Sequence, residues 1–234
     1  MSEKSKAAPK SAPAVKITAA KITAEAIARA ALEQLNESGL DGLTMRQVAQ
    51  RLGVQVATLY WHLKNKRQLL DAMATVMMAD ASEGLEGPRR EESWADWAAD
   101  WARRLRVTML RYRDGGRVFA GTATAGADQY RGTELMLRTL QDGGFAVRDA
   151  ARSFPVILHF TVGFTIEEQA RTGADYADED NPYRANRIFR DLDATRFPLS
   201  AEAHRDLFEE DTDAGFEHGL RIVIAGMSAL HLGQ

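Results

Sequence analysis

The sequence predicts an all-α protein with two parts, a bundle of short helices near the N-terminus and a larger body of longer helices. Two observations lead to this prediction. Apolar residues recur at every third or fourth position over most of the chain after residue 22, which is the periodicity of a helix with one buried face. Capping residues and glycines divide these stretches into separate helices, whereas no segment alternates as a strand does.

The composition excludes several classes of protein. The 234 residues contain no cysteine, so neither a disulfide scaffold nor a thiolate-bound metal site can form. The longest apolar runs, such as residues 222–225, are far shorter than the roughly 20 residues of a membrane-spanning helix. The charged N-terminus is not followed by the apolar core of a signal peptide. We therefore expect a cytoplasmic protein with no membrane partner.

Charge is divided unevenly along the chain. Residues 1–75 contain eleven Lys or Arg against six Asp or Glu, whereas residues 76–234 contain 19 against 27. Such an asymmetry hints at a nucleic-acid-binding end joined to an acidic part. Residues 1–22 are rich in Ala, Lys, Pro and Ser and contain few large apolar side chains, so we expect a flexible basic arm there.

The segment 23–80 divides into four helices, of which the first two are marked most clearly. The apolar face of the first helix is followed by Gly39, a residue typical of a helix C-terminus. Thr44 and Gln47 have the Thr-x-x-Gln spacing of a capping box, which begins the second helix. This second helix is expected to end at Gly53.

The third and fourth helices complete this part of the chain. Residues 54–60 are too few for an independent helix but suit one that is braced by its neighbours. Asn65, three residues before Gln68, is placed to cap the fourth helix. Four short helices with a glycine turn between the second and third are typical of a three-helix helix-turn-helix DNA-binding domain that leads into a connecting helix.

The remaining residues, 81–234, are expected to form a larger helical ligand-binding and dimerisation domain. A linker at 82–93 leads into a helix that begins at Trp94 and is broken by the glycine pair at 115–116. The further segments expected are a helix around 135–140 that stops at 143–144, a long apolar helix over 146–166 that Pro155 should kink or break, a mobile loop over 172–186, and a closing helix over 208–232.

Residues 43–70, LTMRQVAQRLGVQVATLYWHLKNKRQLL, carry the most specific pattern. Through G-L-T-x-R, A-x-x-L-G-V and T-L-Y-W-H-x-K-N-K-R-x-L-L-D, this region resembles the DNA-binding domain of the TetR family. GTATAGADQY from residue 121 and HFTVGFTIEEQ from residue 159 look like that family's ligand-binding domain. The resemblance implies a ligand-responsive transcriptional repressor that binds a palindromic operator in double-stranded DNA as a homodimer and is released by a small effector.

In a helix-turn-helix the second helix lies in the major groove, while the preceding helix and its end hold phosphates. This recognition helix would start near Gln55. Arg46 can form a bidentate pair with guanine, whereas Val56 and Ala57 can only pack on thymine methyl groups. The candidate DNA contacts are Thr44, Met45, Arg46, Val56, Ala57, Thr58, Tyr60, Trp61, His62 and Lys66, together with Lys16 and Lys21 of the arm.

Plainer interpretations stay open for some of these positions. Leu59, Leu63 and Trp61 suit packing in the core or between domains better than contact with bases. The neighbouring polar residues could be ordinary surface positions, and the arm could be a solubilising tail as well as a segment that follows phosphates or the minor groove. Family members that bind the tetracycline operator have glutamine at the position of Val56, so we expect a different operator sequence here.

The resemblance also predicts where an effector would bind. In family members that bind tetracycline, a histidine and a glutamate help to hold a magnesium–drug chelate. Glu167 matches the glutamate, but Phe119 stands at the histidine position, and a phenyl ring cannot ligate a cation. We therefore predict no metal and no cofactor, and a small, largely apolar or aromatic effector. The candidate contacts are Trp101, Leu105, Phe119, Thr122, Met136, His159 and Glu167, of which Trp101 and His159 could equally be core residues.

A palindromic operator requires two DNA-binding domains about 34 to 36 Å apart, which predicts a homodimer. Its interface is expected on the apolar faces of the 146–172 and 208–232 segments, two helices from each copy. The effector is expected to move the helix that begins at Trp94, and through it the connecting helix at 65–79, so that the spacing of the two DNA-binding domains changes.

Two other functions are compatible with the sequence. One is a DNA-binding activator or architectural protein that has no ligand. The other is an enzyme that uses His159 and Glu167 as an acid–base pair, since eight residues place them on related faces of one helix. No H-E-x-x-H, G-x-S-x-G or G-x-x-x-x-G-K-[ST] pattern supports an enzyme, and we predict no catalytic residues.

Overall fold

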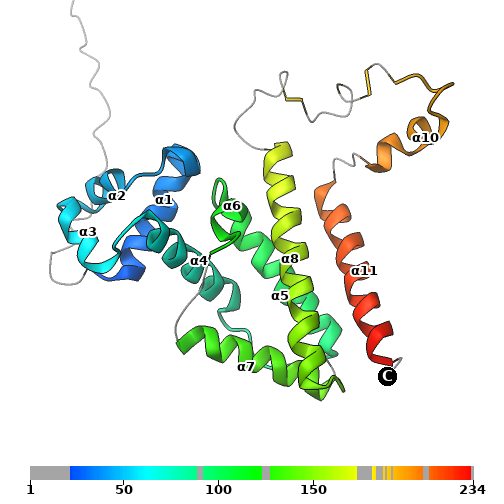
Figure 1. Cartoon of the computed structure of the whole chain (residues 1–234), viewed down its shortest axis with the longest axis horizontal. Coiled ribbons are helices and arrows are strands. Elements are labelled where there is room, and N and C mark those ends of the chain that lie inside the picture. The colour runs from blue at the N-terminus through cyan, green and yellow to red at the C-terminus, as the bar shows by residue number, and fades with distance from the viewer. Residues whose placement is uncertain are drawn as a thin grey trace, which may run out of the picture.

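A computed structural model of the chain describes residues 22–88, 92–122, 127–172, 181–182, 187, 189–190, 192–207 and 211–232. These residues form helices joined by turns, with no strand among them, so the predicted all-α fold is confirmed (Figure 1). None of the described helices is long and apolar enough to cross a membrane. In chain order the helices are α1 (Ala24–Gly42), α2 (Met45–Leu52), α3 (Val56–His62), α4 (Lys66–Ser82), α5 (Trp94–Leu110), α6 (Gly115–Phe119), α7 (Ala127–Asp142), α8 (Val147–Thr172), α10 (Pro198–Leu207) and α11 (Thr212–Leu232).

Local hydrogen bonds and one glycine determine the extent of α1. The side-chain oxygen of Thr23 accepts a hydrogen bond from the backbone amide of Ala26, which satisfies one of the free amides at the helix start. Gly39 has a φ of 64°, a left-handed conformation in which glycine carries no steric cost. The regular helix therefore ends at the predicted glycine, and a short additional turn runs on to Gly42.

Capping residues mark the start of α2 and of α4 as predicted. The capping box between Thr44 and Gln47 is complete, and α2 stops at Gly53, which has a φ of 68°. The Asn65 side chain accepts a hydrogen bond from the backbone amide of Gln68 and so caps α4. Because each of these signals lies within four residues of the helix end that it controls, the start of the chain's fold is encoded locally.

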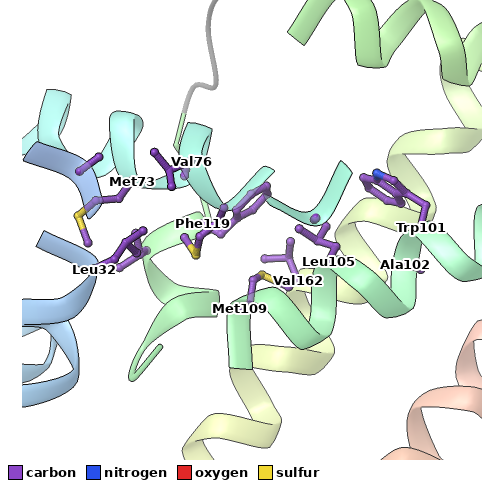
Figure 2. Packing of buried hydrophobic residues seen from close by; sticks show 14 of the residues in the cluster. Leu32, Met73, Val76, Trp101, Ala102, Leu105, Met109, Phe119 and Val162 are labelled. Atoms are coloured by element: carbon purple, nitrogen blue, oxygen red, sulfur yellow. The ribbon is translucent and has the colours of Figure 1, made fainter. Parts of the chain in front are cut away.

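The helices divide into a head, α1 to α3, and a body, α5 to α11, joined by α4 (Figure 1). Helix α4 packs against α1 on the head side and against α5 and α6 on the body side. Figure 2 shows Leu32 of the head beside Met73 of α4, and Val76 of α4 beside Phe119 of the body. One continuous apolar core therefore runs from head to body through α4.

In the body, α8 lies between α5 and α11, and α7 packs on α8 and α5 (Figure 1). The approach of α8 to α11 depends on a glycine, because a Cβ atom at Gly219 would lie only 2.6 Å from ring carbons of Phe160. The ring of Phe160 also stacks on that of Phe216, with centroids 5.5 Å apart. The two helices consequently form a tightly packed pair.

The body differs from the sequence-based expectation at several points. The glycines at 115 and 116 begin the short helix α6, and the break after α5 comes earlier, in a turn where Asp114 has a φ of 59°. Helix α8 continues through Pro155, because a helix packed on α5, α6, α7 and α11 tolerates the loss of one hydrogen bond. Helix α10 was not predicted, and most of the expected 172–186 loop lies outside the described residues.

Candidate DNA-binding surface and effector-binding core

Helix α3 is oriented by two leucines on one face. Leu59 and Leu63 are buried in the head, as the sequence suggested. Trp61, for which packing was also suggested, lies on the opposite side with 88% of its surface exposed, so that suggestion is wrong for this residue. The exposed Trp61 ring is therefore free to contact a partner outside the chain. Ala57, Tyr60 and His62 are exposed with it, while Val56 and Thr58 are half-buried.

Two arginines on α2 have different surroundings. Arg46 is exposed, and it forms no ion pair with any side chain that the structure describes. Arg51 pairs with Glu33 and Glu37 of α1, and the hydrogen bond that it donates to the Glu37 carboxylate raises the pKa of its guanidinium. Arg51 therefore holds α2 on α1, whereas Arg46 has its donors available for a partner outside the chain.

Three of the remaining candidate DNA contacts already make interactions within the head. The Thr44 hydroxyl donates a hydrogen bond of 2.6 Å to the side-chain oxygen of Gln47. Met45 is only 7% exposed, so its side chain belongs to the head's core and offers little surface for the DNA contact that was predicted. The Lys66 ammonium is exposed and donates to the backbone carbonyl of Leu40. Lys16 and Lys21 lie outside the described residues.

Four of the predicted effector contacts are buried in the body. Leu105 of α5 is fully buried, and Phe119, at the end of α6, is 7% exposed. Figure 2 shows the Phe119 ring between Val76 of α4 and Leu105, with Val162 of α8 close by. The Phe119 ring therefore touches the connecting helix as well as the body, and it lies where the two parts meet.

Trp101 lies one turn before Leu105 on α5 and contacts Phe154, which was not among the predicted site residues. Its ring centroid is 4.6 Å from that of Phe154 on α8. Met136, the fourth buried candidate, comes from α7 and is 8% exposed. Thr122 follows α6, and its hydroxyl donates a 2.6 Å hydrogen bond to the backbone carbonyl of Phe119. The structure thus brings four candidates into one apolar core and leaves Thr122 at the edge.

The two remaining candidates are placed differently. His159 and Glu167 are both exposed on α8, on a side of the helix that does not face the buried cluster. Glu167 lines a shallow pocket of about 200 Å³ between α8 and α11. The other residues around that pocket are Phe160, Gly163, Phe164, Glu168, Arg171 and Thr212.

A buried ion pair that was not predicted from the sequence lies in the body. Arg106 and Glu168 are nearly inaccessible, and two hydrogen bonds of 2.8 and 2.6 Å join them. Arg106 also pairs with Asp213 at 2.7 Å, and its guanidinium lies 4.8 Å from the Phe216 ring centroid. Burial acts to lower the pKa of Arg106, but the hydrogen bonds to both carboxylates outweigh it and raise that pKa. The network ties α5, α8 and α11 together.

Head and body also meet through polar contacts around the turn before α6. Asp114 accepts a 2.8 Å hydrogen bond from the backbone amide of Leu40 in the head. Asn36 accepts one of 2.8 Å from the backbone amide of Arg113. At the other end of α6, Arg67 of α4 donates to the carbonyl of Gly121. Residues on both sides of Phe119 are therefore fastened to the head or to α4.

Comparison with known proteins agrees with this architecture. Residues 27–73 match the family described as bacterial regulatory proteins, tetR family, and residues 87–231 match the tetracyclin repressor-like C-terminal domain. The chain belongs to the TetR family. It is 40% identical over 212 residues to the tetracycline repressor protein class A from transposon 1721 of Escherichia coli, which covers 91% of this chain and 93% of that protein.

Solved structures of the family superpose on the same chain. A TetR-family regulator from Streptomyces coelicolor A3(2) has a TM-score of 0.77 at 36% identity, covering 88% of this chain and 99% of its own. ActR from Streptomyces coelicolor, in complex with actinorhodin, has a TM-score of 0.76 at 30% identity, covering 90% and 97%. The predicted family and fold are confirmed, and the function of the class is ligand-responsive transcriptional repression by a dimer that binds operator DNA.

Proposed function

We propose that this TetR-family repressor is released from its operator by a small, largely apolar or aromatic effector that binds among α5, α6, α7 and α8. The observation that carries the proposal is the buried cluster of Trp101, Leu105, Phe119 and Met136, which offers aromatic and aliphatic surface and no charge. The actinorhodin complex of ActR and the tetracycline repressors among the relatives support a ring-containing effector.

A magnesium–drug chelate does not fit these residues. Phe119 stands where a metal-ligating histidine would be needed, and its buried phenyl ring has no lone pair to donate. Glu167 is exposed and lies apart from the cluster. Among the described residues there is no group of three His, Cys, Asp or Glu side chains that could hold a metal ion. The proposed effector therefore binds through shape and apolar contact.

The operator is contacted by the exposed sides of α2 and α3. Arg46 reads a guanine in the major groove, and Ala57 with the half-buried Val56 packs on thymine methyl groups. Phosphates and the groove edge are held by Thr44, Thr58, Tyr60, Trp61, His62 and Lys66, with Lys16 and Lys21 of the arm extending the contact. Met45 supports this surface from inside the head.

The dimer forms through the sides of α8 and α11 that face away from α5. Val156 and His159 on α8 are exposed in the single chain, as are Ile222 and Leu230 on α11. Two such pairs from two copies can close into a four-helix bundle that covers these apolar side chains. The close packing of α8 on α11 at Gly219 supports the pair as one rigid half of this interface.

Effector binding is transmitted to the head through α6 and α4. Phe119 contacts both the body's core and α4, so an effector that displaces its ring also disturbs the packing of the connecting helix. The Arg67 contact to Gly121 and the Asp114 contact to Leu40 lie on either side of that ring. The effector acts by preferring the arrangement in which the two heads no longer match the half-site spacing.

The remaining assignments follow from these roles. The arm comprises residues 1–22, the DNA-binding domain residues 23–80, and the effector and dimerisation domain residues 81–234. A protein that acts on operator DNA works in the bacterial cytoplasm. It is not an enzyme, because His159 and Glu167 are exposed and eight residues apart on one helix, about 12 Å along its axis and too far for an acid–base pair.

A mobility-shift titration tests the proposal. The DNA is the intergenic fragment beside the protein's own gene, and actinorhodin and 5a,6-anhydrotetracycline are added with and without magnesium. We expect binding as a dimer and release by an aromatic compound that does not depend on magnesium. The Met136→Gln variant places an amide in the apolar core and should lose the response while keeping its operator affinity.

Two results would overturn the proposed function. Release that occurs only with magnesium present would contradict an effector held by apolar contact. Binding that no compound of the aromatic panel weakens would favour an activator or architectural protein, because a repressor of this class must have lower operator affinity in its ligand-bound state.

A further inference from the structure

Thr139 of α7 has an unusual hydroxyl group. The residue is only 2% exposed, and its Oγ1 is the one buried side-chain nitrogen or oxygen among the described residues that has no hydrogen-bond partner. Buried polar groups are almost always paired, because leaving one unpaired retains the full cost of removing it from water. An unpaired hydroxyl in a well-packed body therefore calls for an explanation.

Other helical threonines in this chain show that a partner is normally at hand. The hydroxyls of Thr75, Thr108, Thr161, Thr165 and Thr172 each donate a 2.8 Å hydrogen bond to the carbonyl four residues earlier. This local bond is the usual way for a threonine inside a helix to satisfy its hydroxyl. Thr139 lies within a regular helix too, yet its hydroxyl makes no such bond.

The position of Thr139 connects it to the proposed effector core. Met136 precedes it by three residues and is also buried, so the two lie on the same face of α7. That face packs on α5 and α8, the helices that bring Trp101 and Phe154 into ring contact. Valine would fill the same space without a polar atom, and the hydroxyl is the uncommitted polar group beside an otherwise apolar cluster.

We infer that the Thr139 hydroxyl is the hydrogen-bond donor that recognises a ketone or phenol oxygen on an otherwise apolar, aromatic effector. This inference rests on the proposed function and makes it more specific. A hydrocarbon of the same shape would leave the hydroxyl unpaired, whereas an effector with an oxygen on the side facing α7 would satisfy it. A hydrogen bond between the Thr139 hydroxyl and an effector oxygen would allow an apolar core to discriminate between aromatic compounds.

Matched probes and variants of the full-length protein test this assignment. The probes are 2-naphthol and naphthalene, which share a ring system and differ by one oxygen, and their binding is measured by calorimetry. We expect Thr139→Val to weaken 2-naphthol about 5- to 12-fold and to leave naphthalene unchanged or tighter. Thr139→Ser keeps the hydroxyl and should keep the preference for 2-naphthol.

Urea unfolding of the ligand-free protein provides a second, independent readout. Thr139→Val should unfold at the same or a higher urea concentration than wild type, because it removes an unpaired polar group. Thr161→Val is the matched control on α8, and it should unfold at a lower concentration because its hydroxyl bond to Ile157 is lost. A loss at Thr139 as large as that at Thr161 would mean that the hydroxyl has a partner within the protein, and the inference would fail.

The outcomes separate this inference from the proposed function. If both probes bind and Thr139→Val weakens them equally or not at all, the hydroxyl does not recognise oxygen, while the aromatic effector core stands. If wild type binds neither probe, the aromatic core itself is wrong and the role of Thr139 is overturned with it. If Thr139→Val loses affinity for 2-naphthol alone, the result supports both the aromatic effector core and the role of the Thr139 hydroxyl.

Discussion

The head and the body place their functional residues by different means. In the head, the reading surface belongs to helices of seven and eight residues, and the start of the longer one is set by the capping box between Thr44 and Gln47, three positions apart. In the body, the buried candidates come from α5, α6 and α7, and only tertiary packing brings Trp101, Phe119 and Met136 into the same core. The difference teaches that local sequence defines the DNA reader, whereas long-range packing defines the sensor.

If the body depends on long-range contacts, removing one of them should have the largest effect on stability. Glu168→Gln leaves the buried Arg106 without its main counter-charge, and we expect the free energy of unfolding in urea to fall by about 3 to 5 kcal/mol. The body should lose its cooperative transition first. If the free energy of unfolding falls by less than the roughly 1 kcal/mol of an exposed ion pair, the packing of α5, α8 and α11 does not depend on this network.

The head should respond chiefly in DNA binding. Arg46→Ala should weaken operator binding by about 1 to 3 kcal/mol and relax the preference at one base pair, with little change in stability. Arg51→Ala is the matched control on the same helix, because its partners Glu33 and Glu37 lie within the head. Equal losses of operator affinity in the two variants would contradict the assignment of Arg46 as the reader.

Loss of a local cap should have a moderate effect that is confined to the head. Thr44→Ala removes the capping box of α2, and we expect a loss of about 1 kcal/mol in the free energy of unfolding. Thr133→Ala, an exposed position inside α7, serves as the control and should be neutral within a few tenths of a kcal/mol. If both variants behave alike in urea unfolding, the cap does not determine the stability of α2.

The smallest effect is expected at the exposed ion pair that joins α5 to α11. Arg103 lowers the pKa of Glu217 through a hydrogen bond, but both side chains are partly exposed to water, so Glu217→Gln should cost less than about 1 kcal/mol at neutral pH. A lowered carboxyl pKa contributes its full stabilisation at pH values above the ordinary pKa of glutamate, and this stabilisation is lost as the pH falls. The difference in unfolding free energy between wild type and Glu217→Gln should therefore shrink below about pH 4. Urea unfolding at several pH values measures this difference, and growth of the difference at low pH would contradict the pairing.

The sequence predicted most of the head because its signals are local. The capping box at Thr44, the glycines at 39 and 53, and the cap at Asn65 all appear where they were expected. Met45 and Trp61 show the limit of this approach. A helix of seven or eight residues makes too few turns for periodicity alone to tell an outward side chain from a buried one, so both residues were assigned partly to the wrong environment.

The body was less predictable because its chemistry depends on residues far apart in the chain. Glu167 and Glu168 are neighbours, yet one is exposed and the other binds Arg106, 62 residues earlier. A single-residue shift in helical register decides which carboxylate is buried. An arginine on the buried face of α5 was the one available signal, since such a charge requires a carboxylate somewhere in the fold. Thr139 left no comparable signal, because a threonine on a buried helix face usually bonds to its own backbone.

The exposure of Trp61 has a consequence for how this molecule can be observed. The chain has four tryptophans, of which Trp61 alone lies in the head, while Trp94, Trp97 and Trp101 all belong to α5. An indole in water emits at longer wavelength than one enclosed by apolar side chains. The exposed Trp61 and the buried Trp97 and Trp101 therefore emit at different wavelengths, so the head and the body can be followed separately by the protein's own fluorescence.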